Sequence, residues 1–399
     1  MSNFLLKTKL YMPPARPDLV PRPRLTSRLG EALSRPLTVI SAPAGFGKTT
    51  LLGEWRTTAL GRDYPLSWLS LEPDDSDPHR FWTYVIAAIR TLPAFAAAER
   101  LGQTSLELLR TVPGQQPQHY LPSLINELSS GPSPFALVLD DYHAITSPAV
   151  HTAVQLLIDH LPSQMHLVVL TRADPPWPLA RLRSQGRLGE FRAADLRFTD
   201  AEATAFLGRA FDGGLPTEDV TLLQQRTEGW AAALQMAALS LAGQAGQHDR
   251  HQFVTAFAGE NRYVADYLVE EVISRQPEAV QTFLMLTSIL ERMSAPLCAL
   301  VTGQTDASGL LRQIDQSNLF LVPLDDERHW FRYHHLFADL LRARLHRLLP
   351  DLVPTLLQRA SEWHETAGHT IPAVTYALAG EDHQRAARLV EQNVHGWWG

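Results

Sequence analysis

Residues 39–50 read VISAPAGFGKTT, and this stretch decides the fold of the region around it. An apolar strand over residues 37–40 runs into a turn of small residues, and a helical pattern follows the turn. A strand, a turn ending in Gly-Lys-Thr-Thr and a helix are typical of a phosphate-binding loop, with Ala42 where the first glycine usually lies. Small turn residues let backbone N–H groups curl around phosphate oxygens, and the helix N-terminus adds partial positive charge.

This loop predicts a binding site for ATP or ADP together with Mg²⁺. Lys48 would reach the β- and γ-phosphates, and Thr49 would hold the Mg²⁺ ion. We expect the Lys48 side chain to face solvent when no ligand is bound. The residues expected to contact the nucleotide from this loop are Ala44, Gly45, Phe46, Gly47, Lys48, Thr49 and Thr50.

A second apolar strand ends in two carboxylates, since residues 135–141 read FALVLDD. In open α/β sheets, ligands bind at the carboxyl ends of the strands. Asp140 would contact the Mg²⁺ shell, usually through water, and Asp141 would orient or deprotonate the attacking water. A pair of acids at a strand end can also be merely solvated, but the phosphate-binding loop upstream favours the catalytic interpretation.

Other charged residues follow predicted strands at the same edge. Arg172 comes after the strand at residues 167–170 and could sense a γ-phosphate, although it could equally be a surface arginine. Asp74, Asp75 and Asp77 follow the strand at residues 66–71 and could approach a metal. For these three acids we expect a solvated loop instead.

The composition indicates a cytoplasmic protein of about two to four domains. Hydrophobic residues make up 45% of the 399 residues, enough to fill several cores. The single cysteine, Cys298, excludes an intramolecular disulfide and is expected to be a buried apolar residue. The chain shows neither a signal peptide nor an apolar run of about 18 residues, so no membrane contact is expected. The net charge of −7 argues against a broad basic surface for nucleic acid.

Apolar strands alternate with helical patterns from about residue 36 to 195, which predicts an α/β fold with a parallel sheet covered on both faces. Residues 1–30 are expected to be an extended lead-in, because five prolines between residues 13 and 23 interrupt regular structure. The expected strands are residues 37–40, 66–71, 135–139, 167–170 and 188–192.

Strand patterns stop after Thr199, which can cap a helix with Glu202 three residues on. Helical patterns continue to about residue 320, with a linker expected at residues 243–246. A hairpin-like stretch at residues 319–333 follows, and helices before a small hairpin suit a winged helix. From about residue 335 the helix pairs resemble tetratricopeptide repeats. One and a half pairs bury their own face poorly, so more protein is expected beyond Gly399.

Several motifs, taken in order, resemble those of the MalT-like, LuxR-family regulators, which belong to the STAND class of signal-transducing ATPases. The resemblance implies a P-loop ATPase with a five-stranded sheet, a helical domain, a winged helix and the start of a tetratricopeptide-like superhelix that senses an inducer. Ala42 departs from the strict loop pattern. The segments that carry the resemblance are LVPRPRL (19–25), SAPAGFGKTT (41–50), WLSL (68–71), LDDYH (139–143), TRADPP (171–176), TEGW (227–230) and FRYHHLF (331–337).

The resemblance also assigns roles to single residues. It implies that Arg22 packs near the adenine and ribose, and that His334 touches the β-phosphate of ADP and locks a resting state. It implies that residues 227–230 lie where the helical domain closes over the base. The domains expected are a lead-in (1–35), a nucleotide-binding domain (36–197), a helical domain (198–246), a winged helix (247–345) and the start of a helical-repeat sensor (346–399).

The function implied by the resemblance is a regulatory switch. ADP would hold a closed state, while ATP and an unidentified small-molecule or protein inducer would permit self-association and transcription activation. Weak ATP hydrolysis would reset the switch, and DNA would be bound only through a C-terminal domain absent from this chain. Two alternatives remain: a STAND-type signalling or defence NTPase with a different C-terminal effector, and a stand-alone enzyme that hydrolyses NTP.

Overall fold

The computed structural model describes residues 5–14, 19–96, 98, 100–111, 116–131, 134–210, 215–241 and 247–393. The chain forms two compact units, Met1–Arg209 and Ala210–Gly399, each of which is described by itself. The linker expected at residues 243–246 lies outside the described residues, and the finer division into five domains stays a prediction. Within the described ranges, no helix is both long enough and apolar enough to cross a membrane.

The first unit contains a five-stranded sheet of parallel strands in the order β2-β3-β4-β1-β5. All five strands expected from the sequence are confirmed, because short apolar runs that are buried on both faces carry a clear signal. Their bounds are β1 (Leu37–Ser41), β2 (Leu66–Ser70), β3 (Phe135–Asp140), β4 (Met165–Thr171) and β5 (Leu188–Arg192).

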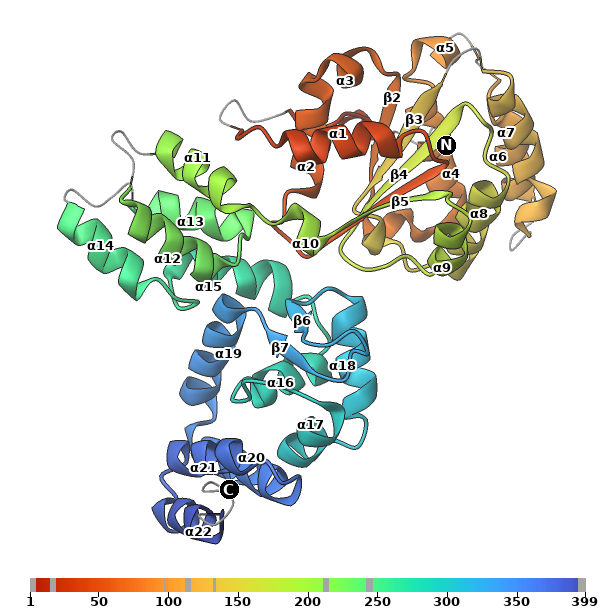
Figure 1. Ribbon diagram of the computed structural model, residues 1–399. Coiled ribbons are helices and arrows are strands. Elements are labelled where there is room, and N and C mark those ends of the chain that lie inside the picture. Colours follow the sequence, from red (N-terminus) through yellow and green to blue (C-terminus); the bar gives the residue numbers. More distant parts are fainter. Residues whose placement is uncertain are drawn as a thin grey trace. The chain divides into compact units, whose positions relative to one another are not determined.

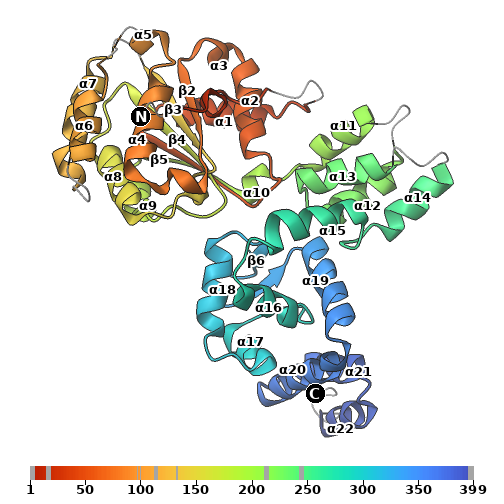
Figure 2. The same ribbon diagram turned by 180° about the vertical axis from the view of Figure 1, so that it is seen from behind.

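Helices cover both faces of this sheet (Figures 1 and 2). The chain moves one way along the sheet from β1 to β2 and the other way through β3, β4 and β5. Right-handed crossovers therefore place α2 and α3 on one face, with α1, and the later helices on the other. The helices on the two faces are α1 (Pro23–Ala32), α2 (Lys48–Thr57), α3 (Ala59–Asp63), α4 (Pro78–Ile89), α5 (Pro93–Ala96), α6 (Gln103–Thr111), α7 (Leu121–Ser129), α8 (Pro148–Asp159) and α9 (Leu179–Ser184). Two more helices, α10 (Ala193–Leu196) and α11 (Asp200–Ala210), follow β5.

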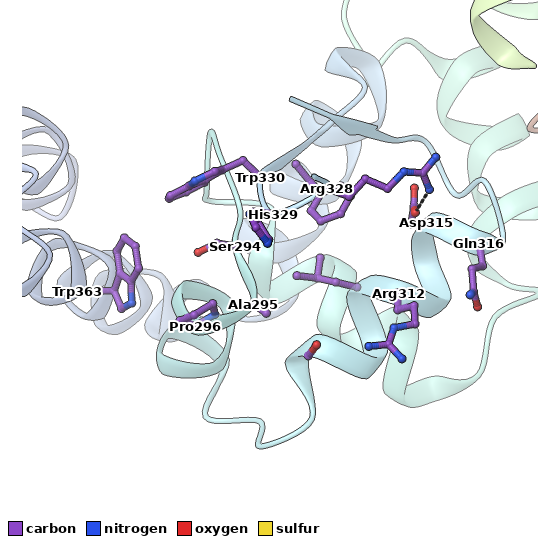
Figure 3. A pocket seen from close by; sticks show the side chains of 13 residues that line it. Ser294, Ala295, Pro296, Arg312, Asp315, Gln316, Arg328, His329, Trp330 and Trp363 are labelled. Carbon is purple, nitrogen blue, oxygen red and sulfur yellow. Dashed lines mark hydrogen bonds and ion pairs between the residues drawn. The ribbon is translucent and has the colours of Figure 1, made fainter. Parts of the chain in front are cut away.

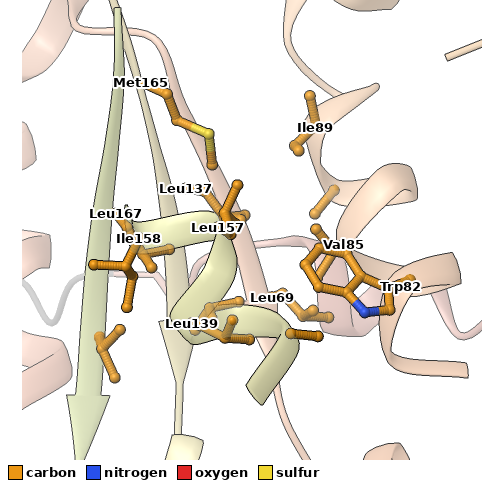
Figure 4. Packing of buried hydrophobic residues seen from close by; sticks show 14 of the residues in the cluster. Leu69, Trp82, Val85, Ile89, Leu137, Leu139, Leu157, Ile158, Met165 and Leu167 are labelled. Atoms are coloured by element: carbon orange, nitrogen blue, oxygen red, sulfur yellow. The ribbon is translucent and has the colours of Figure 1, made fainter. Parts of the chain in front are cut away.

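The main core lies between the sheet and the helices of the second face. Leu137 and Leu139 of β3 point toward α4 and α8, where Trp82 and Leu157 are buried (Figure 4). Every residue of β3 is buried, as expected for a strand with helices on both sides. This rigid layer fixes the positions at which β1, β3 and β4 end, and the candidate site is built on those ends.

The prediction of an extended lead-in is wrong for two segments. Residues Lys7–Leu10 form a short 3₁₀ helix, η1, and Pro23 begins helix α1. Proline is favoured at the first helical position, because an N–H there would have no partner within the helix, so its absence costs nothing. The φ angle of proline also already suits a helix. Leu25 and Leu29 lie one turn apart on α1 and are both buried. Pro23 therefore starts a helix that the prediction treated as blocked.

The expectation of a solvated loop after β2 is wrong for Asp75. Its side chain is fully buried in the 3₁₀ helix η2 (Pro73–Ser76), where it forms ion pairs with Lys9 and Arg80. These two cations hold the pKa of Asp75 below its usual value against the opposing effect of burial, the largest single influence. Asp77 instead caps α4 by accepting a hydrogen bond from the Arg80 N–H at 2.8 Å. Among the described residues, no group of three or more potential metal ligands occurs here or elsewhere.

The expected helix start at Thr199 is confirmed. The Thr199 N–H donates to Glu202 Oε2 at 3.0 Å, and the Glu202 N–H donates to Thr199 Oγ1 at 3.2 Å. This reciprocal capping box satisfies two of the N–H groups at the start of α11.

Among the described residues of the second unit, the regular structure is helical apart from one antiparallel hairpin of β6 (Leu321–Pro323) and β7 (Phe331–Tyr333). The hairpin expected at residues 319–333 is thus confirmed, and Met293 adds a bridge to Phe331. Three successive helices, α20 to α22, pack in order and match the expected one and a half helix pairs. The helices are α12 (Thr217–Thr227), α13 (Ala231–Leu241), α14 (Gln247–Ala256), α15 (Arg262–Leu268), α16 (Glu278–Thr287), α17 (Ala295–Thr302), α18 (Ala307–Gln316), α19 (His335–Leu348), α20 (Val353–Thr366), α21 (Thr370–Ala379) and α22 (His383–Asn393), with a π-helical turn at Val269–Ile273.

Candidate nucleotide site

The phosphate-binding loop lies between the end of β1 at Ser41 and the start of α2 at Lys48. Gly45 and Gly47 have φ angles of 75° and 80°, in the left-handed region that glycine enters without steric cost. Ala42 and Ala44 are buried and keep the turn small. The expected strand, loop and helix are therefore present, with the N-terminus of α2 opening at the carboxyl edge of the sheet.

Lys48 does not face solvent, contrary to the expectation. Its side chain is buried, and Nζ donates to the carbonyl oxygens of Ala42 at 2.9 Å and Pro43 at 3.0 Å. Burial, aided by the nearby charge of Arg172, lowers the pKa of Lys48 to about 8. The loop carbonyls thus hold the ammonium group in place, at the cost of desolvating it.

Thr49 and Asp140 meet at the edge of the sheet. The Thr49 hydroxyl lies 3.5 Å from both carboxylate oxygens of Asp140. Burial and the adjacent charge of Asp141 raise the pKa of Asp140 to about 7. A hydroxyl beside a carboxylate offers the oxygen ligands that Mg²⁺ prefers, and a divalent cation would favour the ionised form of Asp140. The residues present therefore fit the metal that the sequence predicts.

Asp141 differs from Asp140 in exposure. Its side chain is 49% exposed, and its backbone has a φ angle of 55°. Its N–H donates to Asp140 Oδ1 at 3.1 Å, so the two acids are held together although their environments differ. The buried acid suits a metal shell, whereas the exposed one can reach water.

Arg172 follows the last residue of β4, Thr171, which pairs with Ser41 at the end of β1. Its charge contributes to the lowered pKa of Lys48, so the two cations share one edge of the sheet. The sequence left open whether Arg172 serves the site or only the surface, and this proximity favours the site.

Arg22 is buried beside the loop. A Cβ atom built on Gly47 would lie 3.5 Å from Arg22 Nη2. The guanidinium lies 3.6 Å from Glu54 of α2, donates to the Leu196 carbonyl at 3.2 Å, and lies 5.2 Å from the ring centre of Phe198. Burial lowers its pKa, and Glu54 opposes that shift.

Sequence reasoning missed some of the polar residues around the site. Glu54, the only acid in α2, pairs with Arg22. The Ser41 hydroxyl donates to Asp174 at 2.9 Å, and Asp174 pairs with Arg192. Asp174 belongs to the TRADPP motif, so the motif indicated that this residue matters. The sequence pattern did not indicate its partner, Arg192, at the end of β5.

His334 belongs to the second unit and is described within it. Its ring is buried, and Nε2 lies 2.9 Å from the carbonyl oxygen of Thr227. The rings of Trp230 and Phe320 pack edge-on at centroid distances of 5.9 and 5.8 Å. The TEGW and FRYHHLF motifs therefore contact each other, while the contact of His334 with ADP stays a prediction.

Comparisons with known proteins agree with this architecture. Residues 22–170 match the AAA ATPase domain, and residues 269–353 match the MalT winged helix domain. The chain is 34% identical over 376 residues to the serine/threonine-protein kinase PknK of Mycobacterium tuberculosis, covering 94% of this chain and 33% of that protein. It is 34% identical over 403 residues to the HTH-type transcriptional regulator MalT of Cronobacter sakazakii, covering 99% of this chain and 42% of that protein.

A solved Walker-type ATPase of Pyrococcus abyssi matches with a TM-score of 0.54 at 16% identity, covering 83% of this chain and 99% of that one, and shows a shared fold. The chain spans well under half the length of the curated relatives it matches. Within that span, it combines an AAA ATPase domain with a MalT winged helix domain and is homologous to the MalT transcriptional regulators.

Proposed function

We propose that the first unit binds ATP and ADP with Mg²⁺ at the loop between β1 and α2. The observation that carries this proposal is the placement of the Thr49 hydroxyl 3.5 Å from the Asp140 carboxylate, beside a buried Lys48. Oxygen ligands for a cation and a fixed ammonium group are the two features that a Mg²⁺–phosphate chain requires.

Each residue of the site has a separate task in this proposal. Lys48 leaves the Ala42 and Pro43 carbonyls to neutralise phosphate oxygens, and the loop N–H groups surround the phosphate chain. Thr49 and Asp140 would hold the Mg²⁺ ion, which would neutralise charge on the phosphates when bound. Arg22 borders the loop at Gly47 and contributes to the pocket for the ribose and base. Asp141 orients the attacking water, and Arg172 faces the terminal phosphate.

The nucleotide acts as a switch in a regulator rather than as the substrate of a turnover enzyme. ADP favours a resting state in which His334 contacts the β-phosphate, and ATP with an inducer favours self-association. Slow hydrolysis returns the protein to rest. Homology to MalT supports transcription activation as the output, with DNA bound by a part of the protein outside this chain.

A second candidate function keeps the nucleotide switch but replaces transcription activation with another output. The same stretch is equally identical to part of a protein kinase, so one ATPase and winged-helix region occurs with different effectors. A signalling protein with another effector therefore remains the alternative.

Calorimetry with Mg–ATP and Mg–ADP tests the nucleotide site directly. Lys48→Ala should abolish measurable binding, because backbone groups cannot replace its charge. Lys7→Ala, an exposed lysine on η1, is the matched control and should bind as the wild type does. Circular dichroism should show the same helix content in all three proteins. Unchanged ATP affinity in a folded Lys48→Ala protein would rule out this site.

A further inference from the structure

The second unit contains a pocket of about 640 Å³ at the meeting point of the hairpin with α17, α18 and α20. In Figure 3, Trp363 and Arg312 lie at opposite ends of its lining, and Pro296 lies between them. The volume falls in the range of about 300–1,000 Å³ that holds small ligands in proteins. Nothing in the nucleotide mechanism uses this pocket.

One part of the pocket suits an anion. Ser294, Ala295 and Pro296 form its wall at the start of α17, where the first intrahelical hydrogen bond runs from the Cys298 N–H to the Ser294 carbonyl at 2.9 Å. Before that bond, the Ala295 and Leu297 N–H groups have no carbonyl one turn back, whereas Pro296 has no N–H. The partial positive charge of this helix end therefore comes from the N–H groups of Ala295 and Leu297.

A second, independent observation comes from Ser294. The residue is 7% exposed, and its hydroxyl has no hydrogen-bond partner among the described residues. As the N-cap of α17 it makes no side-chain capping bond either. A buried hydroxyl without a partner is costly, and a polar group of a bound ligand would satisfy it.

The charged residues of the lining add to this preference. Two arginines face a single aspartate, and Arg328 is already paired with Asp315 at 2.5 Å. Arg312 is exposed on α18 and forms no ion pair within the part of the chain that the structure describes. Its guanidinium can therefore bind a phosphate or carboxylate without breaking an existing bond.

The other part of the pocket suits a flat ring. The indoles of Trp330 and Trp363 meet edge-to-face with centroids 6.1 Å apart. Trp330 is held by its own backbone, since its N–H donates to Asp325 at 2.8 Å, and the neighbouring Phe331 pairs with Met293. A fixed pair of indoles at this angle offers one face and one edge to a third ring.

We propose that this pocket binds a small aromatic anion, with its ring at Trp330 and Trp363 and its phosphate or carboxylate toward Arg312 and the start of α17. Such a ligand would bridge the hairpin to α20. None of the residues that line this pocket is assigned to the nucleotide site.

Calorimetry of the whole chain with 1-naphthyl phosphate as the probe tests this proposal. The titration uses the Lys48→Ala background, so that binding at the phosphate-binding loop cannot contribute. Arg312→Gln should weaken binding about tenfold or more, as expected for loss of a charge-assisted hydrogen bond. Trp363→Leu should weaken it about threefold to tenfold through the lost ring contact.

Three controls make the outcome decisive. Arg262→Gln removes another exposed arginine, one outside the pocket, and should leave the affinity unchanged. Inorganic phosphate and neutral 1-naphthol should each bind more weakly than the combined probe. Absence of binding at millimolar probe overturns the proposal, as does equal affinity of the Arg312→Gln and parent proteins. Because Arg312 is exposed, its replacement should not prevent folding.

Discussion

Glu228 accepts hydrogen bonds from both terminal nitrogens of the Arg332 guanidinium, at 2.8 and 2.9 Å. The carboxylate also accepts from the His335 N–H at 3.1 Å, and it lies in a backbone with a φ angle of 48° at the end of α12. These hydrogen bonds tie Glu228 to the segment that carries His334. Glu228 therefore joins the TEGW motif to the FRYHHLF motif within the second unit.

Glu228→Ala should lower the free energy of unfolding of the second unit by about 1–3 kcal/mol, because it leaves the Arg332 guanidinium and the His335 N–H without their acceptor. Glu381→Ala is a matched control. Glu381 is exposed and has a φ angle of 59°, so the two replacements share the same backbone cost. Urea denaturation should separate them, and equal midpoints would contradict a stabilising role for the Glu228 carboxylate.

The same pair predicts a dependence on pH. Hydrogen bonds from Arg332, together with the charges of His334 and Arg332, outweigh burial and hold the pKa of Glu228 at about 2. A depressed folded-state pKa contributes stability that is present above the ordinary value of 4.5 and is lost as the pH falls toward 2. The difference in stability between the wild type and Glu228→Gln should therefore shrink between pH 5 and pH 3, as measured by urea midpoints at each pH.

The sequence predicted the sheet and the loop because their signals are local. Five apolar runs and a Gly-Lys-Thr-Thr turn need no partner elsewhere to be recognised. The errors at Asp75 and Lys48 concern side chains whose surroundings depend on the fold and not on the local pattern. Asp75 can be buried because it pairs with Lys9, which lies 66 residues away in the chain. Lys48 turns back toward the loop because the carbonyls of Ala42 and Pro43 accept hydrogen bonds from its ammonium group. Glu54 lies beside the site because it pairs with Arg22, and the helical pattern of α2 does not reveal that partner.

Asp140→Asn should stabilise the nucleotide-free protein at pH 7.5 by roughly 1–3 kcal/mol. Burial and Asp141 raise the folded-state pKa of Asp140 to about 7, above its ordinary value of 3.8. A raised pKa contributes stability that is present below 3.8 and is lost as the pH rises to about 7, so the gain from Asn should be smaller at pH 5. Thermal denaturation at both pH values measures this.

The same substitution should weaken the Mg²⁺ dependence of ATP binding, because an amide is a poorer ligand than a carboxylate. A gain in stability coupled to a loss of function marks a residue kept for its ligand. If Asp140→Asn destabilises the apo protein at pH 7.5, the carboxylate has a structural role instead.

Asp141→Asn should spare ATP binding and slow hydrolysis by about 10²-fold or more. Asparagine tolerates the left-handed backbone at this position, so the replacement keeps the φ angle of 55° without added strain. Phosphate release under saturating ATP measures the rate, and calorimetry measures the affinity. Asp74→Asn, an exposed acid after β2, serves as the control and should hydrolyse ATP at the wild-type rate. A wild-type rate in Asp141→Asn would remove Asp141 from the water-positioning role.

Arg22 should have two separable roles, one in folding and one in ligand binding. Arg22→Met leaves the buried Glu54 carboxylate without its ion-pair partner, and Glu54→Gln removes the ion-pair partner of the buried guanidinium. Each single variant should lose about 2–4 kcal/mol of stability, because breaking a buried pair from one side strands the other charge. The double variant should lose less than the sum, with a coupling of about 1–3 kcal/mol.

ATP affinity should follow a different pattern across the same four proteins. The guanidinium borders Gly47 of the phosphate-binding loop and faces the ring of Phe198, so its loss should weaken binding whether or not Glu54 is present. Stability should therefore recover in the double variant while ATP affinity stays low. Calorimetry after confirmation of folding by circular dichroism decides the point. A double variant that binds ATP as the wild type does would reduce Arg22 to a purely structural partner of Glu54, and the ribose and base would then require other contacts, with Phe198 as the first to replace.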